Sequence, residues 1–176
     1  MPSLGVPVEK SAILSSEPDP LYRYRLDRSW DASRPRMVWI MLNPSTADDR
    51  VDDPTIQACM EIARRNRCGA IVVVNLFALR SSTPRVLLDA EDPVGPRNDT
   101  FLRLVLVDDS RAGDFVIAAW GTNGGLRQRD AAVRAMVADW SLKLKCIGRT
   151  MGGHPKHPLA RGKHRVPRDT PLQEFS

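Results

Sequence analysis

Three short, almost uninterrupted apolar runs constrain the fold more than any other feature of this sequence. They span residues 37–42, 70–74 and 115–120 and are rich in Val, Ile and Ala. Strands that are covered by helices on both faces have nearly continuous apolar sequences, whereas half-exposed strands alternate between apolar and polar residues. Residues 142–147 alternate with lysines, which favours an edge strand. The sequence thus predicts a four-stranded parallel sheet.

Helical patterns separate the four predicted strands. Asp53 and Pro54 form an N-cap and first-turn pair before a helix that runs to Asn66. Two further helices are predicted, over residues 97–107 and over residues 127–140, the second with apolar residues at helical spacing. The order β-α-β-α-β-α-β predicts an α/β fold class, a three-layer α/β/α sandwich with right-handed crossovers.

The chain of 176 residues is predicted to form a single domain, residues 1–176. Residues 12–15 and 22–26 flank a Pro-rich turn and are expected to pair as a β-hairpin within an N-terminal extension, residues 1–36. Residues 148–176 are rich in Gly, Pro and basic residues and are expected to form a loop-rich tail.

Composition favours a soluble, cytoplasmic protein, expected to be a monomer. No apolar run approaches the roughly 18 to 20 residues of a membrane span, and the first ten residues lack the basic and apolar regions of a signal peptide. The three cysteines contain no C-x-x-C pair. Neither a disulfide framework nor a structural zinc is therefore implied, and no cofactor or metal is expected.

The positive charge of the chain is concentrated near its C-terminal end. The net charge is +5, and no acidic residue occurs between Ser141 and Arg168. Such an asymmetry is found both in surfaces that bind phosphates and in solvated basic tails. The basic residues of this stretch are Lys143, Lys145, Arg149, Lys156, Arg161, Lys163, Arg165 and Arg168.

Polar and glycine-rich segments follow all four predicted strands. Asn43 comes after the first strand, Asn75 ends the second and Gly121 follows the third. A segment with two His-Pro pairs, residues 153–159, follows the fourth. Because ligands bind beyond the carboxyl ends of parallel strands, these segments predict a functional site at that edge of the sheet.

These segments resemble, in order and spacing, the motifs of the uracil-DNA glycosylase superfamily. Residues 42–45 (Leu-Asn-Pro-Ser) are similar to its first motif, and residues 73–80 are similar to its strand that ends in Asn and leads into an Arg/Pro loop. Residues 118–121 resemble its third strand with a Gly turn, and residues 153–159 resemble its His-Pro loop. The resemblance covers residues 37–159. It also extends to uncharacterised bacterial and phage proteins known only as a domain of unknown function.

The resemblance implies a uracil-DNA glycosylase-like fold and a DNA glycosylase that hydrolyses the N-glycosidic bond of a flipped base. Asn43 or Asp48 would orient the attacking water, and His154 would stabilise the departing base. Asn75 would read the base edge, with Phe77 stacking on the ring or packing in the core. The residues expected to contact DNA phosphates are Ser45, Arg80, Lys156, Arg161, Lys163, Arg165 and Arg168.

Three departures from the superfamily motifs leave parts of this interpretation open. The usual His-Pro-Ser is replaced by His154-Pro155-Lys156, and His157 opens a second His-Pro pair that competes for the catalytic role. Acidic residues occupy the usual Gly-rich or aromatic stretch of the first motif, and the four cysteines of iron–sulfur members are absent. The substrate base is therefore open: uracil, a mispaired base, or a modified pyrimidine such as a hydroxymethylated or glycosylated base of phage DNA.

Two other functions fit the same residues. A Mg²⁺-dependent nuclease or phosphohydrolase would use oxygen ligands from the acidic cluster of Asp48, Asp49, Asp52 and Asp53. The simpler role for this cluster is to cap the following helix and complement its positive end. Alternatively, the loss of the motif serine favours a module of the same fold that binds nucleic acid without catalysis.

Overall fold

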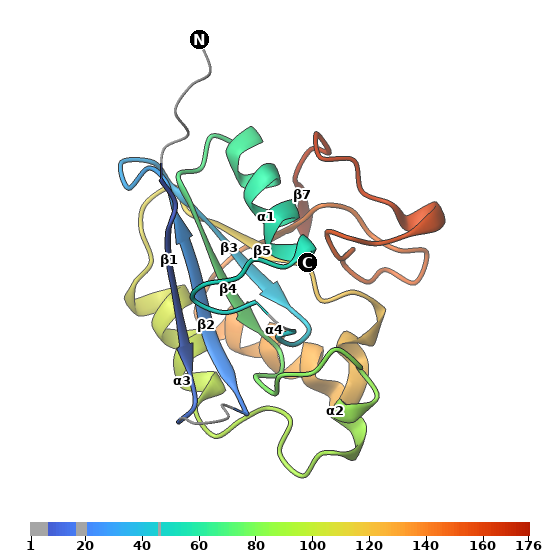
Figure 1. The fold of residues 1–176 in the computed structure, drawn as a ribbon. Coiled ribbons are helices and arrows are strands. Elements are labelled where there is room, and N and C mark those ends of the chain that lie inside the picture. Colours follow the sequence, from blue (N-terminus) through green and yellow to red (C-terminus); the bar gives the residue numbers. More distant parts are fainter. Residues whose placement is uncertain (1–6, 17–20, 46) are drawn as a thin grey trace.

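A computed structural model describes residues 7–16, 21–45 and 47–176, which are built around one sheet (Figure 1). The strand order is β1-β2-β4-β3-β5-β6-β7. The strands are β1 (Glu9–Leu14), β2 (Arg23–Ser29), β3 (Arg36–Met41), β4 (Ala70–Asn75), β5 (Phe115–Ala118), β6 (Leu144–Cys146) and β7 (Gln173–Phe175). The α-helices are α1 (Pro54–Arg65), α2 (Val86–Asp89), α3 (Asn98–Arg103) and α4 (Arg129–Asp139).

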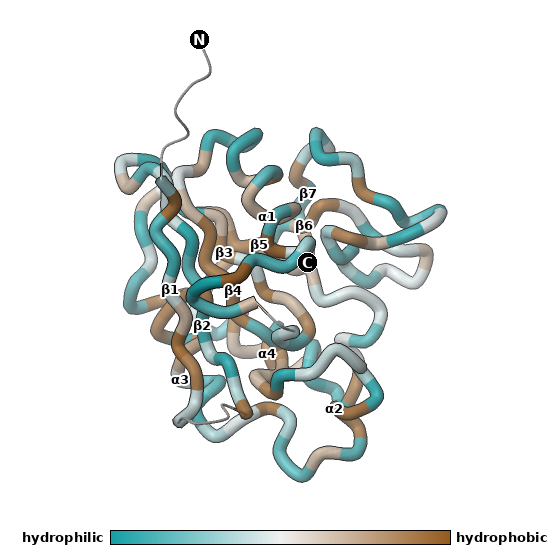
Figure 2. Tube along the Cα trace, in the orientation of Figure 1, coloured by the Kyte–Doolittle hydropathy of each residue, from teal (hydrophilic) through white to brown (hydrophobic). Residues whose placement is uncertain are grey.

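The four parallel strands predicted from the sequence, β3 to β6, form the centre of the sheet. β3 pairs with both β4 and β5, and β5 pairs with β6, all in parallel. Their apolar runs are continuous because each face of the sheet is covered. Trp39 belongs to a core cluster with Ile56 and Ile62 of α1, whereas Ile40 belongs to a second cluster that includes Leu102 of α3 and Val133 of α4. Hydrophobic residues accordingly concentrate in the central strands (Figure 2). The α/β class is confirmed.

The four predicted parallel strands are present, but in the described part of the chain three antiparallel strands extend the sheet to seven. The N-terminal hairpin exists but is longer than predicted, and its strand β2 pairs with β4. Residues 17–20 of the predicted turn lie outside the described residues. β7 pairs with β6, so β6 is not an edge strand. β7 could not be predicted from the sequence because it is short and lies in a polar tail. Phe175 is the one residue of this strand that is buried, and it packs against Trp120.

The helices α1 and α4 begin and end close to the predicted positions, whereas α2 was not predicted. Asp53 caps α1, and its Oδ1 accepts a hydrogen bond of 2.9 Å from the backbone N–H of Ile56. α3 continues into a π-helical turn over Leu104–Asp108, so the predicted helix 97–107 is present as two pieces. Among the described residues, no helix combines the length and the apolar character that crossing a bilayer requires.

A buried ion pair joins the amino ends of β3 and β5. The Arg36 Nε and Nη2 atoms donate to Asp114 Oδ2 at 2.9 and 2.6 Å. The Asp114 carboxylate also accepts the backbone N–H groups of Arg36 and Arg111, and both side chains of the pair are only 6% exposed. Since the guanidinium and the carboxylate are satisfied by each other, neither can be removed without leaving a buried charge.

β2 contains a β-bulge at Tyr24. Opposite Ile13 and Leu14 of β1 lie Arg25 and Arg23, so Tyr24 is the extra residue. Tyr24 and Arg25 both reach the α3 side of the sheet, where Tyr24 stacks on Phe101 at 5.1 Å and Arg25 pairs with Asp109. The bulge thereby directs Arg23 to the opposite face, the side covered by α1.

Candidate functional site

A pocket of about 320 Å³ opens at the carboxyl ends of β3, β4 and β5. This is the position predicted from the sequence, and the volume lies at the small end of the roughly 300–1,000 Å³ typical of ligand sites. Its polar side chains come from segments that are far apart in the sequence. They include Arg23 of β2, Asn43 and Ser45 after β3, Asp53 before α1, Asn75 of β4, and His157 of the tail.

Asn75 lines the pocket and has an unsatisfied acceptor. The residue is 2% exposed, and its buried Oδ1 has no hydrogen-bond partner among the described residues. Asn98 of α3 fixes the backbone around it by donating to the carbonyls of Asn75 and Leu76 at 2.9 and 3.0 Å. Buried amide oxygens are nearly always hydrogen-bonded. The Asn75 Oδ1 is therefore an acceptor that a bound ligand can satisfy.

Asn43 connects the loops that follow β3 and β4. Its Nδ2 donates to the carbonyls of Ser81 at 2.8 Å and Pro44 at 3.1 Å. The donor side of the amide is thus used structurally, and its Oδ1 is the atom that can accept from a water or a ligand.

His157, and not His154, lines the pocket. The His157 Nδ1 accepts a hydrogen bond of 3.1 Å from the backbone N–H of Leu159, so the ring proton lies on Nε2. Burial lowers the pKa of His157 below its usual 6.5, against an opposing effect of Asp53. The imidazole is therefore neutral at pH 7 and carries a donor N–H. His154, the histidine preferred from the sequence, does not line this pocket and lies in a turn closed by Thr150.

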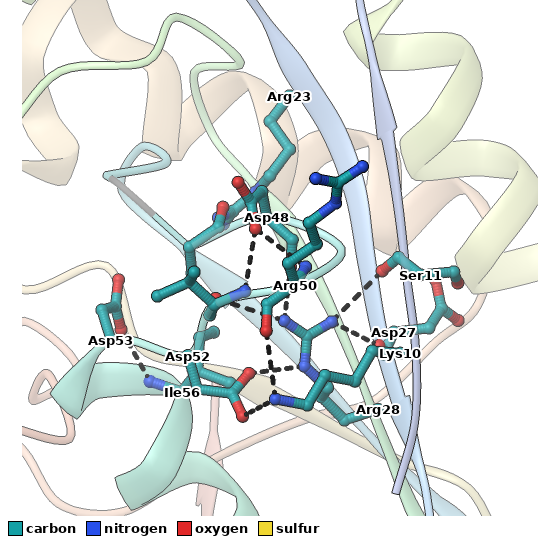
Figure 3. A network of polar contacts seen from close by, with 12 residues as sticks. Lys10, Ser11, Arg23, Asp27, Arg28, Asp48, Arg50, Asp52, Asp53 and Ile56 are labelled. Atoms are coloured by element: carbon teal, nitrogen blue, oxygen red, sulfur yellow. Dashed lines mark hydrogen bonds and ion pairs between the residues drawn. The ribbon is translucent and has the colours of Figure 1, made fainter.

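The carboxylates of the acidic cluster do not point toward a common position where a metal ion could bind. Asp48 caps its own loop by accepting the backbone N–H groups of Arg50 and Val51 at 2.8 and 2.9 Å, and these bonds lower its pKa. Asp52 pairs with the fully buried Arg28 at 2.6 Å and with Lys10 at 2.7 Å (Figure 3). Within the described part of the chain, no three His, Cys, Asp or Glu residues are placed to hold a metal ion. The hypothesis of a metal-dependent enzyme therefore has no geometric support in these residues.

Of the four aspartates, only Asp53 lines the pocket. Its Oδ1 caps α1, and the loop that carries it is held against β2 by the Arg28–Asp52 pair (Figure 3). Asp48, which the sequence favoured as a water-orienting residue, does not line the pocket. The choice between the two cannot be made from spacing, because both follow the same strand.

Phe77 is not positioned to stack on a ligand in this pocket. Its side chain is fully buried in the core cluster that includes Leu102 and Val133. The alternative role considered from the sequence, core packing, is the one that the structure shows.

The residues predicted to bind phosphates are divided between two surfaces. Ser45 lines the pocket, whereas Arg80 lies partly buried beyond β4. Lys156 and Arg165 line a hollow of about 350 Å³, and an adjacent hollow of about 440 Å³ is lined by basic residues. Those of the second hollow are Arg161, Arg165 and Arg168. Lys163 is exposed, and Arg168 is engaged with Glu61 at 3.3 Å and with the Pro158 carbonyl.

Trp120 forms a wall of the pocket that depends on a glycine. A Cβ on Gly124 would stand 2.1 Å from the nearest indole atom of Trp120, whereas a Cβ on Gly125 would meet nothing within 4 Å. We expect Gly124→Ala to displace the indole, shift the tryptophan fluorescence and lower the melting temperature. Gly125→Ala, the matched control, should change neither. Equal behaviour of the two variants would show that Trp120 does not depend on this contact.

Among the residues that line the pocket, sequence reasoning did not identify Arg23, Asp53 or Trp120 as lining residues. Arg23 carries no sequence signal, because it is the first residue of a strand rich in charged residues and reaches the pocket side only through the bulge. Trp120 does carry one, since it directly follows an apolar strand at the predicted edge of the sheet.

Comparison with known proteins identifies one family. The family model described as a protein of unknown function (DUF1643) matches residues 23–159. No curated protein and no solved structure gives a significant match. The matched residues include every polar pocket residue named above, from Arg23 to His157.

Proposed function

The chain belongs to the DUF1643 family of proteins of unknown function, and on the geometry of its pocket we propose that it is a DNA glycosylase. The reaction is hydrolysis of the N-glycosidic bond of an extruded pyrimidine-like base, which leaves an abasic site. The fold that we propose with it is a uracil-DNA glycosylase-like sandwich, extended by three antiparallel strands.

The observation that carries this proposal is the unsatisfied, buried Oδ1 of Asn75 in a pocket that also holds the neutral His157. A pyrimidine edge offers alternating donors and acceptors, and an amide side chain matches such an edge. The small pocket volume, about 320 Å³, suits a single base rather than a whole duplex segment. The base must then leave the helix to enter, which costs a few kcal/mol.

In the proposed mechanism a water molecule attacks the sugar C1′ while the C1′–N bond breaks. The electron pair of that bond leaves with the base, and the Nε2–H of His157 stabilises the negative charge that develops there. Asn43 Oδ1 and Asp53 are the pocket groups that can orient the water. The water gives its oxygen to C1′, and its released proton is finally taken up by the departing base.

The proposal is tested with oligonucleotides that each carry one candidate base, in single- and double-stranded form. The products are heated in alkali, which cleaves the strand at abasic sites. We expect cleavage for one class of base, unchanged by EDTA, and lost in Asn75→Ala. Binding without cleavage for all bases would instead favour the non-catalytic module, and strand cleavage that EDTA abolishes would favour a nuclease.

The exposed basic residues of the tail are proposed to contact phosphates outside the pocket. Replacing Arg161, Lys163 and Arg165 by Ala should flatten the dependence of log K on log salt by roughly 0.9 for each phosphate that is no longer neutralised. The matched control replaces Arg67, Arg103 and Arg111, which are also exposed but lie elsewhere. Fluorescence anisotropy with labelled DNA at several salt concentrations measures both slopes. Equal slopes for the two triple variants would contradict the placement of DNA on the tail.

A further inference from the structure

Arg23 is a buried cation with no assigned role in the proposed reaction. It is 3% exposed and lines the pocket. Its Nη1 donates to the Ala47 carbonyl at 2.6 Å, whereas its buried Nε has no partner among the described residues. A donor left in this condition is rare inside proteins.

Arg23 also differs from the other buried arginines in its charge balance. Those arginines have carboxylate partners: Arg28 has Asp52, Arg36 has Asp114 and Arg129 has Asp99. Among the described residues, no carboxylate lies within ion-pair distance of Arg23. Burial lowers its pKa to about 10, and the positive charges of Arg80 and Arg28 act in the same direction, while Asp53 opposes them.

From this geometry we infer that the pocket recognises an oxyanion carried by the base itself, and that Arg23 is the residue that binds it. An anionic group at this position would accept from the Nε–H and neutralise the buried guanidinium. The ligand class is a pyrimidine with an acidic ring substituent, such as a carboxylate. The inference rests on the proposed function only in that the ligand is a base.

Nucleotide phosphates are a second source of oxyanions, but the position of Arg23 disfavours them. The Arg23 side chain is buried, and its Nη1 is bonded to the carbonyl of Ala47, a residue with no exposed surface. Backbone phosphates stay at the mouth of a base-binding pocket, where the exposed basic tail is available.

The test measures the binding of free ligands by isothermal titration: uracil, 5-carboxyuracil, 6-carboxyuracil, deoxyuridine and deoxyuridine monophosphate. We expect at least one carboxyuracil to bind about 10- to 100-fold more tightly than uracil, the range of a charged hydrogen bond. Arg23→Gln should abolish this difference, and Arg23→Lys should retain part of it, since the ammonium keeps the charge without the planar donors.

The matched control is Arg25→Gln, which removes the same charge from the same strand on the opposite face and should leave the preference unchanged. Melting temperatures establish that each variant is folded. The affinities of the unaltered protein for the five ligands test the inference even if a variant fails to fold. Equal affinity for uracil and both carboxyuracils overturns the inference. So does a preference that survives Arg23→Gln, or one shown only by the monophosphate. Because free bases are used, a failure to cleave DNA would contradict the proposed function and leave this result standing.

Discussion

His157→Ala is expected to slow base excision by about 10² to 10³-fold, the usual effect of losing a donor to a developing negative charge. DNA binding should persist, because the proposed phosphate contacts lie on the tail. His154→Ala is the matched control, since this residue belongs to the same loop but does not line the pocket. Single-turnover rates on the active substrate measure both. A wild-type rate for His157→Ala beside a slow His154→Ala would return the role to His154.

The protonation state of His157 predicts how the rate responds to pH, which can be checked in the same assay. Its pKa lies below 6.5, so the ring is already neutral between pH 7 and pH 8. If the neutral Nε2–H is the donor, the rate should not fall across this interval through His157. A rate that decreases with the titration of a single group near pH 7 would require the imidazolium, and would contradict the neutral-donor role.

The largest expected effect on stability belongs to Asp114→Ala. Removing this carboxylate leaves Arg36 charged and buried, and it also leaves the backbone N–H groups of Arg36 and Arg111 without their acceptor. Breaking a buried pair in this way typically costs about 3–5 kcal/mol. The free energy of unfolding, measured by urea denaturation, should decrease by that amount.

Asp89→Ala is the control for this experiment. It removes the same group from a pair with Arg85 whose side chains are 85% and 75% exposed and whose N and O atoms lie 4.0 Å apart. Exposed pairs contribute about 0–1 kcal/mol, so little change is expected. If Asp114→Ala were as stable as Asp89→Ala, the Arg36–Asp114 pair would have no important part in joining β3 to β5.

The features of the fold that were predictable depend on local signals. The continuous apolar runs identified β3, β4 and β5, and the Asp53-Pro54 pair located the start of α1. The pairing of β2 with β4 left no such signal, because β2 reads RYRLDRS and its buried arginines resemble solvent-exposed residues. Arg28 becomes buried only because the loop after β3 supplies Asp52, a partner distant in sequence.

Some residues of the candidate site were predictable from the sequence and others were not. Asn43 and Asn75 follow strand ends, and the geometry of parallel sheets is sufficient to bring them to one edge. The choice between His154 and His157 depends on the path of a loop that is held by contacts distant in sequence, such as the hydrogen bond from the Gly121 N–H to the Pro155 carbonyl. Loop paths of this kind are decided by tertiary contacts, and two adjacent His-Pro pairs are equivalent at the level of sequence.

The bulge at Tyr24 has a consequence for how the family should be compared. Side chains alternate along a regular strand, so one additional residue reverses the face reached by every residue on its far side. In a relative whose β2 has no bulge, an arginine that enters the pocket must occupy the position aligned with Tyr24, and the residue aligned with Arg23 faces away. The loss of the bulge and a one-residue shift of the arginine should therefore occur together wherever the alignment has no gap at Tyr24. An alignment column that seems to lose the arginine can still belong to a protein that keeps it in space.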